Sequence, residues 1–219
     1  MRIVIAGAGL AGRAIAIDLL ALGHEVTIMD RQPSAMRVSQ VSGADWLLAD
    51  ACELSSLRDA RVDSADVVVA ATGDDKANLV ISFLSKTEFG VPRTVARVNN
   101  PKNEWMYDAT WGVDVAVSAP RMMTAMVEEA VAVGDLVKVF TFHQSNASIH
   151  EVTLPKDSPL VGSMVRELSW PADVVLTCVV RGDRAITPTP DDTLEAGDEL
   201  LFILSPEADP KALADALRS

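Results

Sequence analysis

The sequence lacks any apolar run approaching the roughly 18 residues that a membrane-spanning helix needs. Its densest apolar stretch, residues 67–71, has only the length of a β-strand. The N-terminal Met1-Arg2 leads directly into a predicted strand, without the apolar region and small-residue cleavage site of a signal peptide. We therefore expect a cytoplasmic protein.

Cysteine and basic residues are also scarce. Cys52 and Cys178 lie far apart and outside any Cys-x-x-Cys pair, which argues against a disulfide framework or a zinc site and favours small buried side chains. The 19 Lys and Arg are outnumbered by 31 Asp and Glu, giving a formal net charge of −12. Because binding to nucleic acid requires a basic surface, we expect no nucleic-acid partner.

The first part of the chain alternates between short apolar strands and helices. Because hydrophobic residues make up 49% of the chain, we expect a well-filled core. Strands are predicted over residues 2–6, 26–30, 46–50, 66–71, 94–98 and 113–117. Helices are predicted up to residue 22 and over residues 33–42, 54–61, 74–89, 103–110 and 120–133. This alternation predicts an α/β fold with a Rossmann-type, doubly wound parallel sheet.

The pattern changes after Gly134-Asp135. Strands are predicted over residues 137–142, 149–154, 174–180 and 199–204, and helices over residues 160–168 and 210–217. Short strands with two helices favour a small α+β module. We predict a nucleotide-binding domain over residues 1–134, which includes the helix 120–133, and a second domain over residues 135–219.

A glycine-rich turn follows the first predicted strand. Its sequence Gly7-Ala8-Gly9-Leu10-Ala11-Gly12 has the GxGxxG spacing, opens a helix, and is followed by Asp30 at the end of the next strand. In such turns the first glycine permits the bend, the second admits the pyrophosphate, and the third lets helix and strand pack closely. The helix N-terminus binds phosphate through free N–H groups.

The acidic residue after the second strand bears on the choice of nucleotide. Asp30 would accept hydrogen bonds from ribose hydroxyls and would repel a 2′-phosphate. This favours NAD or an adenosine nucleotide over NADP, although the neighbouring Arg31 slightly weakens the exclusion of a 2′-phosphate.

Other polar residues follow strands at the same edge of the sheet. Asp50-Ala51 and Thr72-Gly73 end the third and fourth strands, where ligands of α/β proteins bind. Asp50 either contacts the ligand or caps the next helix, and Asp74 or Asp75 is expected to cap the helix after the fourth strand. Arg97 interrupts an apolar strand and needs an anionic partner, either a nucleotide phosphate or a buried carboxylate.

Catalytic groups are missing. The sequence has no locally supported Ser-His-Asp set, metal-spaced cluster or P-loop lysine, and its second module offers only His143 and His150. His150 lies on an alternating strand and is interpreted as a surface or packing residue. We therefore predict a sensor without enzymatic activity. The alternatives are a small NAD-dependent oxidoreductase and a free-standing redox or energy sensor.

These motifs together resemble the cytosolic regulatory proteins of Trk/Ktr potassium-uptake systems, which consist of an RCK N-domain and an RCK C-domain (regulator of K⁺ conductance). In the first domain the resemblance is carried by residues 7–12, 30, 49–51, 70–78, 96–101, 111–114 and 118–120. In the second it is carried by residues 151–152, 158–162, 166–168, 181–182, 186–188 and 194–200.

The resemblance implies a gating-ring subunit that binds NAD(H) or ATP/ADP. The ring would be a homo-oligomer, built from dimers, or would include a related RCK chain. It would lie at the inner face of the cell membrane, beneath a membrane-embedded potassium-uptake subunit. No catalytic or metal residues are expected. The predicted nucleotide contacts are Gly7, Ala8, Gly9, Leu10, Ala11, Gly12, Asp30, Arg31, Asp50, Ala51, Thr72, Gly73 and Arg97.

The helix 120–133 resembles the family's crossover helix. Its apolar face would comprise Met122, Met123, Met126, Val127 and Val131, and the alternative is packing within the domain's own core.

Several positions depart from the pattern. Leu10 stands where ATP-responsive members often have arginine, which favours NAD(H) over ATP/ADP. Arg121 replaces the glutamate of members that bind a divalent ion, so no such ion is expected. Residues 169–173 lack the Arg and Asn that bind cyclic di-AMP in some members.

Overall fold

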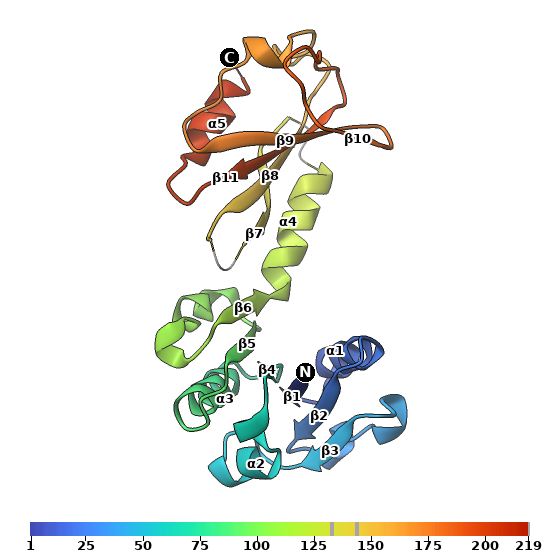
Figure 1. Cartoon of the computed structure of the whole chain (residues 1–219), viewed down its shortest axis with the longest axis vertical. Coiled ribbons are helices and arrows are strands. Elements are labelled where there is room, and N and C mark those ends of the chain that lie inside the picture. The colour runs from blue at the N-terminus through green and yellow to red at the C-terminus, as the bar shows by residue number, and fades with distance from the viewer. Residues whose placement is uncertain (132–133, 143–144, 219) are drawn as a thin grey trace. The chain divides into compact units, whose positions relative to one another are not determined.

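The computed structural model describes residues 1–131, 134–142 and 145–218, with the backbone alone for residues 128–130. The chain divides into two compact units, Met1–Arg121 and Met122–Ser219 (Figure 1). This division falls within a helix, and the expected domain boundary at residue 134 stays a prediction.

The first unit contains a six-stranded parallel sheet in the order β3-β2-β1-β4-β5-β6. The strands are β1 Arg2–Ala6, β2 Glu25–Asp30, β3 Asp45–Leu48, β4 Val67–Ala70, β5 Arg93–Val98 and β6 Val115–Ser118. The helices that begin in this unit are α1 Leu10–Ala21, α2 Leu54–Asp59, α3 Asp75–Thr87 and α4 Ala119–Val131. The strand order reverses between β1 and β4, which confirms the predicted Rossmann-type sheet.

Both faces of this sheet are buried. Along β1, Val4 belongs to one hydrophobic cluster, whereas Ile3 and Ile5 belong to another. Successive side chains of a strand point to opposite faces, so a strand covered on both sides must be apolar throughout. This burial explains why the strands form continuous apolar runs in the sequence and not alternating patterns.

Two predicted helices of this unit are wrong. Residues 33–42 form only the 3-10 turns Pro33–Ala35 and Val38–Gln40, because Val41 alone is buried and no apolar face supports a helix. Residues 103–110 are divided between the 3-10 turns η4 Pro101–Met106 and η5 Ala109–Trp111. The Asp108 carboxylate accepts the Thr110 N–H at 2.9 Å, and this local bond starts a new turn in place of a continuous helix.

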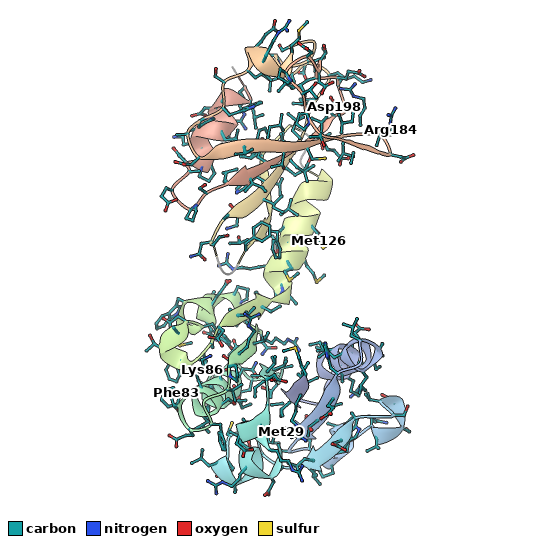
Figure 2. All side chains as sticks on the ribbon, viewed as in Figure 1. Met29, Phe83, Lys86, Met126, Arg184 and Asp198 are labelled. Atoms are coloured by element: carbon teal, nitrogen blue, oxygen red, sulfur yellow. The ribbon has the colours of Figure 1, made fainter. Side chains whose placement is uncertain are left out.

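The second unit contains a five-stranded antiparallel sheet in the order β10-β9-β11-β8-β7. The strands are β7 Val137–Thr141, β8 Ser148–Thr153, β9 Val174–Arg181, β10 Arg184–Ile186 and β11 Glu199–Leu204, followed by helix α5 Pro210–Ala216. The small α+β module is therefore confirmed. The three-residue strand β10, which includes Arg184 (Figure 2), was not predicted.

A predicted helix of the second unit is also wrong. Residues 160–168 contain only the 3-10 turn Val165–Glu167. Gly162 has φ +91°, and its N–H bonds the Leu194 carbonyl at 2.9 Å, while Met164 forms a β-bridge with Thr193. Pairing with residues 192–194 therefore takes the backbone groups that a helix would use.

An ion pair between a half-buried arginine and a buried carboxylate joins β9 to the loop before β11. The fully buried Asp198, labelled in Figure 2, accepts from Arg181 Nε at 2.7 Å and Nη2 at 2.8 Å. Burial opposes ionisation, but the hydrogen bonds from Arg181 and the Glu195 N–H outweigh it and lower the pKa of Asp198. Asp198 therefore remains charged inside the unit.

Candidate functional site

A cavity of about 410 Å³ opens at the carboxyl edge of the parallel sheet, where the strand order reverses. This switch point is where ligands of doubly wound sheets bind. The lining residues are Gly7, Gly9, Met29, Asp30, Arg31, Gln32, Ala35, Ala49, Asp50, Ala51, Cys52, Ala71, Thr72, Gly73, Asp74, Ala77, Ile81 and Arg97.

Two glycines of the turn after β1 are required by packing. Gly7 has φ +111°, and a Cβ atom there would lie 2.8 Å from the main chain of Ala71 and Thr72. A Cβ on Gly12 would lie 1.9 Å from the carbonyl oxygen of Gly7. Only glycine lets the turn approach the end of β4 and lets α1 approach the turn this closely.

Gly9 differs from these two glycines, because a Cβ there would meet nothing within 4 Å. It lines the cavity and is the N-cap of α1, where glycine offers no side-chain acceptor. The first N–H groups of a helix have no acceptor within the helix. The turn therefore leaves an open backbone and a helix N-terminus beside the cavity, which is the arrangement that binds anions.

Asp30 connects this turn to the loop after β2. Its Oδ2 accepts the Ala8 N–H at 2.8 Å, and its Oδ1 accepts the Gln32 N–H at 2.8 Å. Each carboxylate oxygen has a second lone pair, so Asp30 can accept further hydrogen bonds from a ligand in the cavity that it lines.

Asp50 belongs to the cavity wall and does not cap a helix. Its Oδ1 accepts the Cys52 N–H at 2.9 Å, and its Oδ2 lies 3.5 Å from the Arg31 guanidinium. Helix α2 begins later, with Glu53 as its N-cap, so the capping alternative for Asp50 is wrong. Burial, followed by the charge of Asp50, raises the pKa of the Cys52 thiol to about 11, which keeps this thiol protonated.

Thr72 and Arg97 line the cavity at the ends of β4 and β5. The Arg97 side chain is half-buried, and no carboxylate lies within 4.0 Å of it among the residues that the structure describes. The described structure therefore gives Arg97 no buried carboxylate partner. A guanidinium in this position attracts an anionic ligand.

The two aspartates at the start of α3 have different roles. Asp74 is its N-cap, as expected, and accepts the Lys76 N–H at 2.9 Å. Asp75 is buried and accepts N–H groups of Asn99, Asn100 and Asn103 at 2.7 to 3.0 Å. Burial opposes the charge, but these donors outweigh it and lower the pKa of Asp75 to about 2.

The cavity brings together most of the predicted nucleotide contacts. Gly7, Gly9, Asp30, Arg31, Asp50, Ala51, Thr72, Gly73 and Arg97 line it, whereas Ala8, Leu10, Ala11 and Gly12 do not. These four belong to the same turn and helix start, where Ala8 is buried and the Leu10 side chain is 84% exposed. Sequence reasoning missed the apolar lining residues such as Met29 and Ile81, which look like ordinary core positions.

His150, the histidine of the second unit that the structure describes, shows no catalytic setting. His150 is buried in β8 and its Nε2 lies 3.0 Å from Ser148 Oγ, which confirms the packing interpretation. His143 lies outside the described residues. Within the described ranges there is no group of three or more His, Cys, Asp and Glu that could hold a metal ion. None of the helices described is long and apolar enough to cross a membrane.

Comparison with known proteins gives two family matches and a close relative. The model of the TrkA-N domain matches residues 3–119, and that of the TrkA-C domain matches residues 149–211. The chain is 49% identical over 209 residues to the Trk system potassium uptake protein TrkA of Mycobacterium tuberculosis, covering 95% of each chain.

Solved structures share the fold. The chain resembles the GsuK channel bound to NAD with a TM-score of 0.67 and 16% identity, covering 100% of this chain and 39% of that one. It resembles GsuK bound to ADP with a TM-score of 0.50 and 26% identity, covering 59% of this chain and 34% of that one. At 16% identity the first likeness is one of fold alone.

Proposed function

This chain belongs to the family of Trk-system potassium-uptake proteins with TrkA-N and TrkA-C domains, and from that membership we propose that it is a cytosolic, nucleotide-sensing regulator of potassium uptake. The observation that carries the proposal is the cavity at the switch point of the sheet. It combines an open glycine turn, an anchored carboxylate and a cavity-lining arginine without a carboxylate partner in the described structure.

The ligand of this cavity is NAD(H), with ATP or ADP as the alternative. The pyrophosphate lies over Gly9 at the N-terminus of α1, and the Asp30 carboxylate accepts the ribose hydroxyls. Arg97 supplies a positive charge for phosphate. A 2′-phosphate would meet the negative charge of Asp30, so NADP(H) binds more weakly. The NAD and ADP named for the two GsuK structures agree with this ligand class.

The partner is a membrane-embedded potassium-uptake subunit, and the chain acts on it as part of an oligomeric ring. Met122, Met123, Met126, Val127 and Val131 of α4 are between 55% and 73% exposed, and Met126 is labelled in Figure 2. This exposure argues against packing of that face in the domain's own core. It supports pairing with a second copy, or with a related RCK chain, at the inner face of the membrane.

Nucleotide binding regulates uptake by shifting an equilibrium between ring conformations. A ligand shifts such an equilibrium only by its difference in affinity for the two states. Moving the ratio from 1:99 to 99:1 needs a difference of about 5.5 kcal/mol, which the sites of a dimer can share. No chemical turnover of the nucleotide is required for this role.

Potassium uptake in cells tests the proposal. Cells in which the gene for this chain is deleted are complemented with the wild type, with Asp30→Ala, or with the matched control Asp45→Ala. Asp45 is an exposed aspartate of β3 that does not line the cavity. We expect the wild type and the control to restore uptake and Asp30→Ala to fail. Full restoration by Asp30→Ala would contradict the proposal.

A further inference from the structure

A buried asparagine outside the cavity lies against its wall. Asn78 is on α3, is fully buried, and does not line the cavity. Its Oδ1 accepts the Thr72 N–H at 2.9 Å and the Thr72 hydroxyl at 2.6 Å. Its Nδ2 donates to the Thr72 carbonyl at 3.2 Å and to the Arg97 carbonyl at 2.8 Å. One side chain therefore holds two residues that do line the cavity.

The amide of Asn78 uses its hydrogen-bonding capacity on these two residues. A primary amide has two N–H donors and one carbonyl oxygen with two lone pairs, and all of them are engaged here. An aspartate would keep the acceptors and lose both donors, and a leucine would lose all four bonds. Because buried groups left without partners are costly, an amide suits this position better than either.

We propose that Asn78 is a positioning residue for phosphate recognition, which holds the end of β4 at Thr72 and the end of β5 at Arg97 in fixed register along the cavity wall. The inference rests on the proposed function, because Asn78 is assigned to position the part of the same cavity that would bind phosphate. Asn78 touches no ligand. It acts by restricting the motion of Thr72 and Arg97 before the ligand binds, so that less conformational entropy is lost on binding.

A second set of hydrogen bonds holds the same edge of the sheet independently of Asn78. Asn99 donates from Nδ2 to the Thr72 carbonyl at 3.1 Å and to Asp75 Oδ1 at 3.0 Å, while Asp75 also accepts the Asn99 N–H at 2.7 Å. The loop after β5 therefore remains attached to Thr72 and to the start of α3. Loss of Asn78 removes the direct tie to Arg97 without releasing the whole edge.

Binding of two probes separates positioning from a general structural role. NADH carries ribose, adenine and pyrophosphate, whereas adenosine carries no phosphate. Each is titrated into the full chain as wild type, Asn78→Ala, Arg97→Gln and the double variant. Ser85→Ala is the matched control, because Ser85 is another buried polar residue of α3 and does not line the cavity.

We expect Asn78→Ala to weaken NADH binding roughly tenfold and adenosine binding less than about twofold. Arg97→Gln should show the same preference for NADH. The double variant should bind NADH no more than about twofold more weakly than Arg97→Gln alone, since residues that act through one another are not additive. Ser85→Ala should match the wild type.

The outcomes separate the inference from the function on which it rests. A wild type that binds neither probe removes the proposed function and the inference together. A wild type that binds NADH, with Asn78→Ala binding equally well, overturns the inference alone. Equal losses for NADH and adenosine, or additive losses in the double variant, also overturn it. If Asn78→Ala does not fold, Asn78→Ser replaces it, because a neutral hydroxyl has one donor in place of two and cannot keep the bonds to both the Thr72 and the Arg97 carbonyls, and the same expectations apply.

Discussion

The two glycines that flank α1's first residues should respond to the same substitution in opposite ways. In Gly12→Ala the new Cβ would lie 1.9 Å from the Gly7 carbonyl oxygen, whereas in Gly9→Ala it would meet nothing within 4 Å. Gly12→Ala therefore tests the close packing of the turn against α1, and Gly9→Ala tests the open space beside Gly9.

The magnitudes follow from these distances. Overpacking costs about 1–3 kcal/mol or more, and a clash with a main-chain atom belongs at the upper end of that range. The gain of about 1 kcal/mol from alanine's helix propensity does not offset it, so Gly12→Ala should lose at least about 2 kcal/mol of unfolding free energy. Gly9→Ala has an N-cap φ of −65°, which alanine adopts, and loses only about 0.5–1 kcal/mol.

Ligand binding should show the reverse order. The methyl group of Gly9→Ala occupies the space through which a pyrophosphate approaches the backbone, so NADH affinity should fall about tenfold or more, equivalent to about 1.4 kcal/mol. Urea denaturation followed by circular dichroism measures stability, and calorimetric titration measures NADH affinity. The reasoning is refuted if Gly9→Ala binds like the wild type, or if it is destabilised as much as Gly12→Ala.

Four further predictions concern stability and assembly. Arg181→Leu leaves the carboxylate of Asp198 buried and unpaired and should lower the unfolding free energy of the second unit by about 3 kcal/mol in urea denaturation. Burial, followed by the charge of Lys138, lowers the pKa of His150 in the folded protein. As the pH drops below about 6.5, the unfolded state therefore binds a proton that the folded state does not, and the unfolding free energy should fall. His150→Gln should remove this fall in stability. The low pKa of Asp75, about 2, should contribute stability that is complete above about pH 4 and lost toward pH 2, and Asp75→Asn should make the loss of stability in acid smaller than in the wild type. Light scattering at micromolar concentration should show a dimer or larger assembly that Met126→Asp weakens, and a monomeric wild type would count against the ring.

The sheet and its cavity were predictable because local patterns and general rules of α/β folds point to the same place. A continuous apolar strand, a glycine turn and an acidic strand end each have a fixed position in a doubly wound sheet, so Gly9, Asp30 and Thr72 could be assigned to one edge. The charge of Arg97 in an apolar strand predicted an anionic partner, either a nucleotide phosphate or a buried carboxylate, and the structure places this residue in the cavity wall.

Features that depend on tertiary partners could not be predicted. The segment 160–168 has apolar residues at helical spacing, but pairing with residues 192–194 decides its conformation. The role of Asp75 likewise depends on the loop after β5, where its partners lie 24 to 28 positions away in the sequence. The role of Asn78 depends on Arg97 of β5, which lies 19 positions away. A single sequence gives no signal for such pairings beyond the unusual number of asparagines in residues 99–103.

Calorimetric titration of the purified chain with NADH, NAD, ATP and ADP tests the central claim most directly. The account predicts micromolar binding of at least one of them, with the reduced dinucleotide unconsumed during the titration. It also predicts that Asp30→Ala abolishes this binding while Asp45→Ala does not. Absence of binding by all four, or undiminished binding by Asp30→Ala, would contradict the claim that this cavity senses a nucleotide.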